Sequence, residues 1–187
     1  AEPEFIDIYT VTHRYASCLY TTHGHTPDAP RVRILFPFTR DVTPDEYVAI
    51  MRYLAAELGI DQFDPCSYRP QQLMYWPTTP SNGEFIFRAF EGPWLDPDVY
   101  LAAHPNWRDC SQLPTSAKES MIVKREQTKQ KDPLTKPGVV GAFCRAYSIE
   151  AAIDAFLPDV YKPSVADDRR DYVNGTSSAG LVLYDGK

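Results

Sequence analysis

The sequence lacks long apolar runs, paired cysteines and an excess of positive charge. No apolar stretch among its 187 residues approaches the roughly 20 that cross a bilayer. No secretory signal peptide is visible, so we expect a cytoplasmic protein that does not enter a membrane. The four cysteines are widely spaced and form no Cys-x-x-Cys pair, so neither a zinc ribbon nor a disulfide framework is indicated.

Glycine is also scarce, and the charge balance is acidic. Nine glycines stand against seventeen prolines, which predicts many rigid turns and short elements. The net charge of -6 argues against a surface that binds nucleic acid on every side. It leaves room for a local basic groove, and carboxylates that hold divalent metal ions would themselves make a chain acidic.

The most informative stretch is residues 20–37, which predicts a strand, a polar loop and a second strand. On the second strand, three apolar residues alternate with two arginines and a leucine: Val32, Ile34 and Phe36 against Arg31, Arg33 and Leu35. If the strands pair, one face is buried and the other presents two guanidinium groups near His23 and His25. Guanidinium forks and imidazole suit a phosphate-bearing ligand. The alternative is an ordinary hairpin with exposed arginines.

Other segments predict an α+β domain, with a mixed or antiparallel sheet and flanking helices. Thr43, Pro44 and Glu46 form a capping box that starts a helix, and Gly59 ends it. Two further helices are predicted at 3–14 and 96–104. Strands are predicted at 15–22, 72–76 and 84–90, the last two joined through a turn at Asn82-Gly83.

The composition changes after Trp107. Residues 118–136 are basic and predict a linker, partly helical, in which Lys124 and Arg125 would contact a nucleic-acid backbone. A solvated connector is the alternative that base rates favour. Two helices at 137–147 and 149–157 and a hairpin at 172–183 follow. We therefore expect a core at 1–116, a linker at 117–136 and a small, truncated helical and hairpin appendage at 137–187.

Several segments together resemble the primase-polymerase domain of phage and mobile-element replication proteins. That domain belongs to the archaeo-eukaryotic primase superfamily and is often joined to a virulence-associated E-type helicase. The resemblance is carried by residues 20–27, 30–33, 59–64 and 73–77, and continues through 92–97, 107–109, 131–133 and 141–145.

The resemblance implies a site and a reaction. The superfamily's Ser-or-Thr-x-His motif would be Thr21-Thr22-His23, with His23 on the triphosphate of an incoming nucleotide. Its apolar-Asp motif would be Phe63-Asp64, with Asp64 holding catalytic Mg²⁺ or Mn²⁺. Strand geometry would add Arg31 and Arg33 beside the phosphates, and Arg69 would contact nucleic acid. The implied partners are nucleoside triphosphates, a single-stranded DNA template and a replicative helicase, in the cytoplasm of a bacterial host cell.

The sequence departs from this family in three places. The acidic pair that relatives carry before the first helix is absent, since Asp7 has no second acid beside it. Gln72 stands where relatives tend to have arginine, and the chain stops where relatives continue. We therefore expect either a fragment or a form that has lost catalysis.

The alternative function is a non-catalytic module that binds nucleic acid or a replication protein. A metal site at His23-x-His25 is a third possibility, although it lacks visible further ligands.

Overall fold

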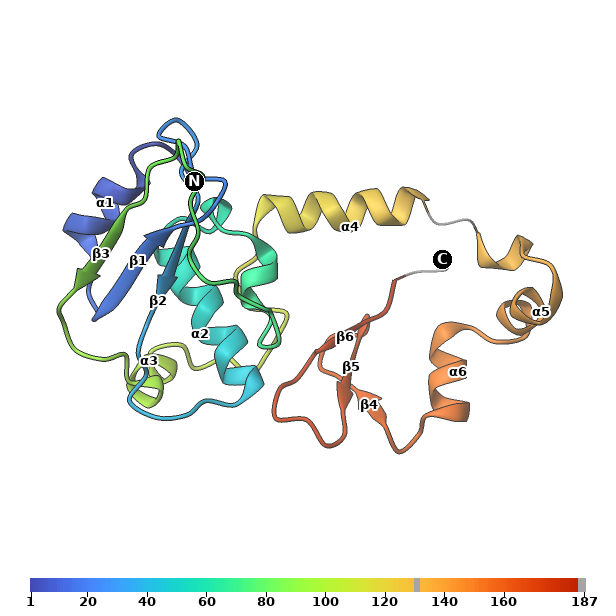
Figure 1. Cartoon of the computed structure of the whole chain (residues 1–187). Coiled ribbons are helices and arrows are strands. Elements are labelled where there is room, and N and C mark those ends of the chain that lie inside the picture. The colour runs from blue at the N-terminus through green and yellow to red at the C-terminus, as the bar shows by residue number, and fades with distance from the viewer. Residues whose placement is uncertain (130–131, 185–187) are drawn as a thin grey trace. The chain divides into compact units, whose positions relative to one another are not determined.

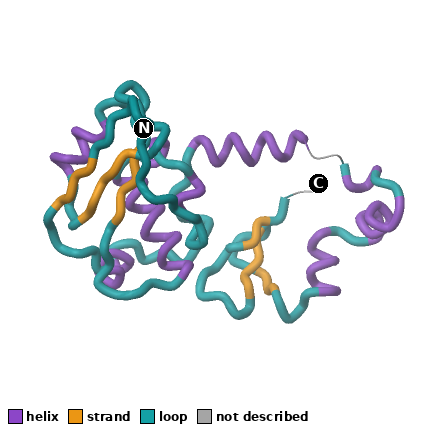
Figure 2. The backbone as a smooth tube through the Cα atoms, in the orientation of Figure 1, coloured by secondary structure: helices purple, strands orange, loops and turns teal. Residues whose placement is uncertain are grey.

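The structure is a computed structural model, and it describes residues 1–129 and 132–184, without the side chains of 124–129. The chain forms two compact units, residues 1–105 and 106–187. Each unit combines helices with a small antiparallel sheet (Figures 1 and 2), so the predicted α+β class is confirmed. The domain limits expected at 116/117 and 136/137 remain predictions.

The first unit is built around a three-stranded antiparallel sheet. Strand β1 (Ser17–Thr21) lies in the centre, between β2 (Val32–Leu35) and β3 (Phe87–Phe90). The hairpin of β1 and β2 was predicted from the sequence and is confirmed. Because β1 is hydrogen-bonded on both edges, it is the most buried strand, and Leu19 is fully enclosed.

The two faces of this sheet differ. On one face Leu19 packs with Phe5, Ile6 and Tyr9 of helix α1 (Phe5–Thr12) in the core cluster. Partly buried apolar residues surround this cluster: Val32, Ile34, Phe36, Leu58, Phe63, Ile86 and Phe90. The alternation predicted for β2 is thus confirmed.

The other face carries a row that crosses all three strands. Tyr20 stands opposite Arg33 on β2 and opposite Phe87 on β3. Directly opposed residues of antiparallel strands project from the same face. A guanidinium and two aromatic rings therefore share the face turned away from α1.

Helix α2 (Pro44–Glu57) forms as its local sequence predicts. Thr43 and Glu46 make the reciprocal bonds of a capping box, and Gly59 adopts φ +90° just beyond the helix. Two short 3-10 helices follow, η1 (Ile60–Gln62) and η2 (Pro65–Tyr68). Helix α3 (Pro97–Ala102) begins at its predicted cap, where the Asp96 carboxylate accepts from Asp98 N and Val99 N.

The strand predicted at 72–76 is wrong, and so is the hairpin that was to join it to residues 84–90. Residues 73–80 have no regular secondary structure, and only residues 87–90 of the second segment form a strand. Pro77 and Pro80, just after the predicted strand, cannot donate to a ladder, and the carbonyl oxygen of Tyr75 accepts from the Arg33 side chain instead. Asn82-Gly83 lies instead in a local turn, closed by Gly83 N donating to Pro80 O at 2.9 Å.

Over residues 106–129 and 132–184, the second unit has helices and a second sheet. The helices are α4 (Ala117–Lys129), the 3-10 helix η3 (Pro133–Thr135), α5 (Gly138–Ala146) and α6 (Ile149–Phe156). The predicted helices at 137–147 and 149–157 are confirmed. The sheet has the order β4 (Tyr161–Pro163), β5 (Arg169–Tyr172), β6 (Leu181–Val182), all antiparallel. A C-terminal hairpin is present as β5 and β6, but its first strand begins at Arg169, before the predicted range 172–183. The short, proline-containing β4 was not predicted.

Across the described ranges 1–129 and 132–184, no helix is long and apolar enough to span a bilayer.

Candidate functional site

The loop between β1 and β2 is folded by its own backbone. Thr22 N donates to Arg31 O at 2.8 Å and closes its base, while His25 N donates to Thr22 O at 2.9 Å. Ala29 N donates to Thr26 O at 3.2 Å near the tip. These short-range bonds give the loop a defined shape before any ligand arrives, which reduces the ordering entropy that binding must overcome.

His25 supports this loop from inside. Its side chain is buried, and its Nδ1 accepts a hydrogen bond from Arg31 N at 3.3 Å. An imidazole nitrogen that accepts carries no proton, so in neutral His25 the proton is on Nε2. Nε2 is enclosed and has no hydrogen-bond partner among the described residues. His25 is therefore held as a structural part of the loop.

His23, two residues earlier, is exposed on the same loop. Its Nδ1 lies 3.3 Å from Thr78 Oγ1. The side chain of Arg31 folds back over the loop, since a Cβ added at Gly24 would lie 3.3 Å from Arg31 Nη1. The loop thus presents an imidazole, a hydroxyl and a guanidinium group to solvent.

Arg33 extends this cationic region along β2. It is half-buried, and its Nη1 donates to the carbonyl oxygen of Tyr75 at 2.5 Å. Together with the contact between His23 and Thr78, this bond fixes the irregular segment 73–79 against the hairpin. Sequence analysis missed Tyr75 and Thr78, because no local pattern reveals a partner 42 or 55 positions away.

Thr21 lies beneath the loop. It is fully buried, its N donates to Ile86 O at 3.0 Å, and its Oγ1 accepts from Ile86 N at 2.9 Å. These bonds continue the pairing of β1 with the segment before β3. The hydroxyl of Thr21 is thus occupied by the backbone, and His23 is the exposed member of the Thr21-Thr22-His23 motif.

Asp64 is exposed and caps η2: its Oδ1 accepts from Cys66 N at 2.9 Å. Within residues 1–129 and 132–184, no group of three or more His, Cys, Asp or Glu side chains is arranged to hold a metal ion. Asp7 is no substitute for the missing acidic pair, because it lies on α1 with its carboxylate 3.7 Å from Arg88 Nη1. The described residues therefore do not fit a two-metal centre.

The three predicted nucleic-acid contacts have different positions. Arg69 is exposed just after η2, in the first unit. Lys124 and Arg125 lie on α4 in the second unit, where their side chains fall outside the described part of the chain. The structure brings His23, Arg31 and Arg33 together on one hairpin, and Arg69 lies outside that hairpin.

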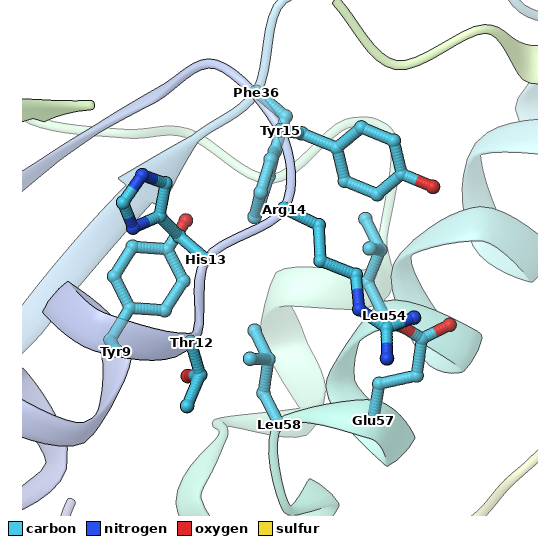
Figure 3. Close-up of a pocket in the computed structure, with 9 residues that line it drawn as sticks. All are labelled: Tyr9, Thr12, His13, Arg14, Tyr15, Phe36, Leu54, Glu57 and Leu58. Atoms are coloured by element: carbon cyan, nitrogen blue, oxygen red, sulfur yellow. The ribbon is translucent and has the colours of Figure 1, made fainter. Parts of the chain in front are cut away.

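A small pocket of about 130 Å³ lies elsewhere in the first unit, between α1 and α2 (Figure 3). It is lined by Tyr9, Thr12, His13, Arg14, Tyr15, Phe36, Leu54, Glu57 and Leu58. Arg14 Nη1 lies 3.9 Å from Glu57 Oε2, and His13 Nδ1 lies 3.0 Å from Thr10 O. None of the predicted site residues lines this pocket.

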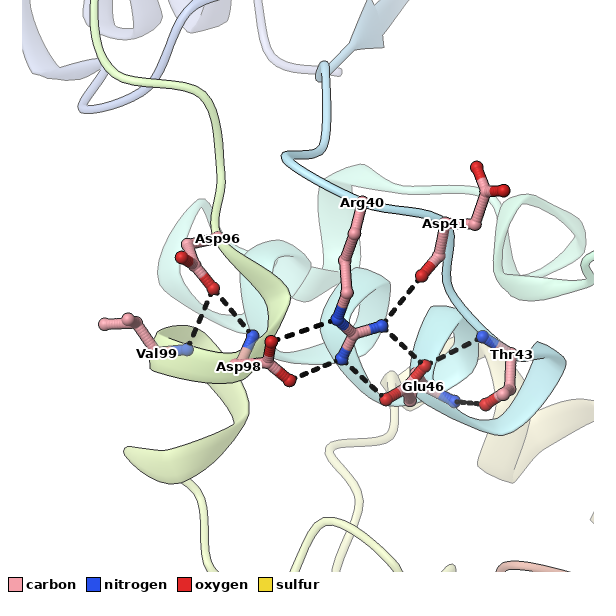
Figure 4. A network of polar contacts seen from close by, with 7 residues as sticks. All are labelled: Arg40, Asp41, Thr43, Glu46, Asp96, Asp98 and Val99. Atoms are coloured by element: carbon pink, nitrogen blue, oxygen red, sulfur yellow. Dashed lines mark hydrogen bonds and ion pairs between the residues drawn. The ribbon is translucent and has the colours of Figure 1, made fainter.

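The densest group of polar contacts is centred on Arg40 (Figure 4). Its guanidinium donates to both carboxylate oxygens of Glu46 and of Asp98, and also to Asp41 O. Hydrogen bonds from Arg40 lower the pKa of Glu46 and the pKa of Asp98. Because Glu46 belongs to the capping box of α2 and Asp98 to the first turn of α3, this group joins two helix starts. We assign it a structural role.

The fold and the site define a small α+β domain whose central hairpin displays His23, Arg31 and Arg33. The sequence matches the VapE N-terminal domain family over residues 1–116, which is more than half of the chain, and the chain belongs to this family. Membership links it to the VapE-like replication proteins of phages and mobile elements. Searches among curated proteins and among solved structures find no match.

Proposed function

We propose that the hairpin binds the triphosphate of a nucleotide, as part of a primase-polymerase domain that acts on single-stranded DNA. The observation that carries the proposal is the grouping of His23, Arg31 and Arg33 on one ordered hairpin. Guanidinium groups bind phosphate oxygens in a bidentate manner, and an exposed imidazole can donate to a further oxygen. Thr78 adds a hydroxyl 3.3 Å from His23.

Charge supports a phosphate ligand at this place. The chain as a whole carries -6, so an anion is repelled by much of the surface and attracted where cations are grouped. The hydrogen bond from Arg31 N to the buried ring of His25 contributes order to the loop. The anion would therefore meet groups whose positions are already set.

Nucleotidyl transfer would require carboxylates in addition to Asp64 to hold the metal ions. The resemblance implies Mg²⁺ or Mn²⁺ at Asp64, and a two-metal reaction needs several acidic ligands around the ions. Among the described residues, Asp64 has no further carboxylates grouped around it to complete such a set, and one of its oxygens caps η2. The function proposed for the described residues is therefore nucleotide binding, without a catalytic step.

A second candidate is a non-catalytic binding module on the same fold, and the solitary position of Asp64 favours it. The two candidates differ in one assay. Template-directed incorporation of nucleotides by the full chain, abolished in Asp64→Ala, would establish the enzyme. Nucleotide binding without incorporation would support the non-catalytic binding module.

The experiment for the hairpin is a titration of a fluorescent deoxynucleoside triphosphate against the 187-residue chain, with and without Mn²⁺. We expect His23→Ala and Arg31→Ala each to weaken binding about tenfold, as for one lost charge-assisted hydrogen bond. Inorganic tripolyphosphate should compete, because the recognised groups are phosphates.

Arg14→Ala is the matched control, since Arg14 is an exposed arginine of the same unit outside the hairpin. Its affinity for the nucleotide should equal that of the parent chain. The proposal is wrong if the folded chain binds no triphosphate, or if the two hairpin variants bind as tightly as Arg14→Ala does.

A further inference from the structure

Beside the hairpin lies a group of exposed aromatic rings that the site above does not use. Trp76 is 90% exposed and Tyr75 is 72% exposed. Phe87 of β3 is 58% exposed, on the sheet face turned away from α1, and Phe85 is 48% exposed just before it. In the described part of the chain, none of these four rings is in contact with another aromatic ring.

These rings are held next to cations rather than scattered. Arg33 Nη1 bonds the carbonyl oxygen of Tyr75, the residue before Trp76. Thr78 is fixed to His23, so residues 75–78 follow the hairpin between two tethers. Across the sheet, Arg33, Tyr20 and Phe87 form one cross-strand row. Arg33 therefore shares a sheet face with the Phe87 ring, and its side chain is bonded to the segment that carries Tyr75 and Trp76. We call this group of residues the aromatic face: Arg33, Tyr75, Trp76, Phe85 and Phe87.

The chemistry of this surface favours one kind of occupant. Exposed rings beside arginines suit unpaired bases, which stack on the rings while their phosphates meet the cations. A sheet with aromatic residues on neighbouring strands is a known platform for bases of a single strand. The adjoining hairpin carries two guanidinium groups, Arg31 and Arg33, which suit the phosphates of such a strand. A protein partner would be expected to cover an aliphatic patch or to bring acids of its own.

We propose that the aromatic face binds single-stranded DNA by stacking of bases on Trp76 and Phe87, with Arg33 contacting the backbone. This surface adjoins the triphosphate-binding hairpin and shares Arg33 with it, whereas Trp76 and Phe87 belong to the aromatic face alone. The proposal deepens the proposed function by assigning residues to the template strand, and it rests on that function only for the choice of DNA as the strand.

The test is fluorescence anisotropy of a labelled oligo-dT 20-mer with the full chain, together with quenching of tryptophan emission. Stacking of bases on exposed rings contributes about 1–3 kcal/mol per base, so Trp76→Ala should weaken binding at least about fivefold. Trp76→Phe should keep most of the affinity but lose the quenching. Phe87→Ala should weaken binding similarly.

Trp94→Ala is the matched control, because Trp94 is 59% exposed and lies beyond the far end of β3. It should leave affinity unchanged. Far-UV circular dichroism and thermal unfolding should match between variants, since none of these side chains is in the core cluster. Affinity should fall with rising salt and be lower for a blunt duplex of the same length.

Three results would overturn the inference. The first is the absence of single-strand binding by the folded chain. The second is an affinity for DNA that Trp94→Ala changes as much as Trp76→Ala does. The third is a Trp76→Ala variant that alters self-association of the chain and leaves DNA binding intact, which would assign the face to a protein contact. If the chain binds no triphosphate but still binds DNA through Trp76, the proposed function is wrong and this inference stands. If the chain binds triphosphate but does not bind DNA through Trp76, this inference is wrong and the proposed function stands.

Discussion

Arg33 Nη1 donates a hydrogen bond to the carbonyl oxygen of Tyr75 at 2.5 Å, and so joins residues 42 positions apart. The bond ends on the peptide group that links Tyr75 to Trp76. It therefore holds the exposed aromatic segment at the point where it passes β2.

Loss of this bond should expose the segment to proteolysis. In Arg33→Ala, chymotrypsin should cleave after Tyr75 about two- to tenfold faster, because a partly exposed hydrogen bond contributes about 0.5–1.5 kcal/mol. Mass spectrometry of early time points measures the rate. Arg31→Ala should be cleaved like the parent chain, since its guanidinium lies over Gly24 instead. Equal rates in the parent and Arg33→Ala would show that the bond does not restrain the segment.

The capping box of α2 should be measurable in stability. Thr43→Ala removes the side-chain acceptor of Glu46 N and should lower the free energy of unfolding by about 1 kcal/mol. Urea denaturation followed by circular dichroism measures it. Thr43→Ser keeps the hydroxyl and should retain most of the stability. A Thr43→Ala variant as stable as the parent would contradict the role of the cap.

Stability should fall in acid through the Arg40 group. The pKa values of Glu46 and Asp98 are lowered below their ordinary 4.5 and 3.8 by hydrogen bonds from Arg40. A carboxyl with a depressed pKa in the folded state stabilises the fold above its unfolded pKa, and this contribution is lost as pH falls through the folded value. Urea midpoints should therefore decline from about pH 5 downward.

Arg40→Leu should reduce that decline, because the two carboxyls then titrate nearer to their ordinary values. The comparison is the difference in urea midpoint between pH 7 and pH 3 for the two chains. If the parent chain and Arg40→Leu lose stability equally between pH 7 and pH 3, these ion pairs do not contribute to the pH dependence of stability.

Gly92 lies where a side chain does not fit. A Cβ there would be 2.9 Å from Ala16 N and 3.0 Å from the carbonyl carbon of Tyr15, and Ala16 N also donates to Pro93 O. Because backbone cannot withdraw as a side chain can, Gly92→Ala should destabilise the fold by about 1–3 kcal/mol. Gly180→Ala, with open space around it, should be close to neutral. Thermal unfolding distinguishes the two, and matched melting temperatures would refute the argument.

The comparison of sequence with structure shows which features are local. The start and end of α2 follow from Thr43, Glu46 and Gly59, since capping groups satisfy backbone groups within a few residues of themselves. The same holds for Asp96 at α3 and Ser148 at α6. The β1–β2 hairpin is local too, and the alternation of Val32, Ile34 and Phe36 indicated its buried face.

The sequence around Asp64 is compatible with several structural roles. A carboxylate before proline can hold a metal ion, cap a helix or face solvent, and the sequence left these open. The fold places Asp64 as the cap of η2. Whether it also meets a metal ion depends on carboxylates from other parts of a chain, which no local spacing can reveal.

The sequence by itself determined the helix limits, the hairpin and the membership of a replication-linked family, because these depend on local hydrogen bonding and on motif order. Only the tertiary structure decided that β3, not residues 72–76, pairs with β1, and that Tyr75 and Thr78 lie against Arg33 and His23. The physical reason is that contacts between segments far apart in the sequence depend on the packing of the whole chain, which no local pattern records. Residues 73–79 were left outside the sheet, and their aromatic side chains were left exposed beside the hairpin.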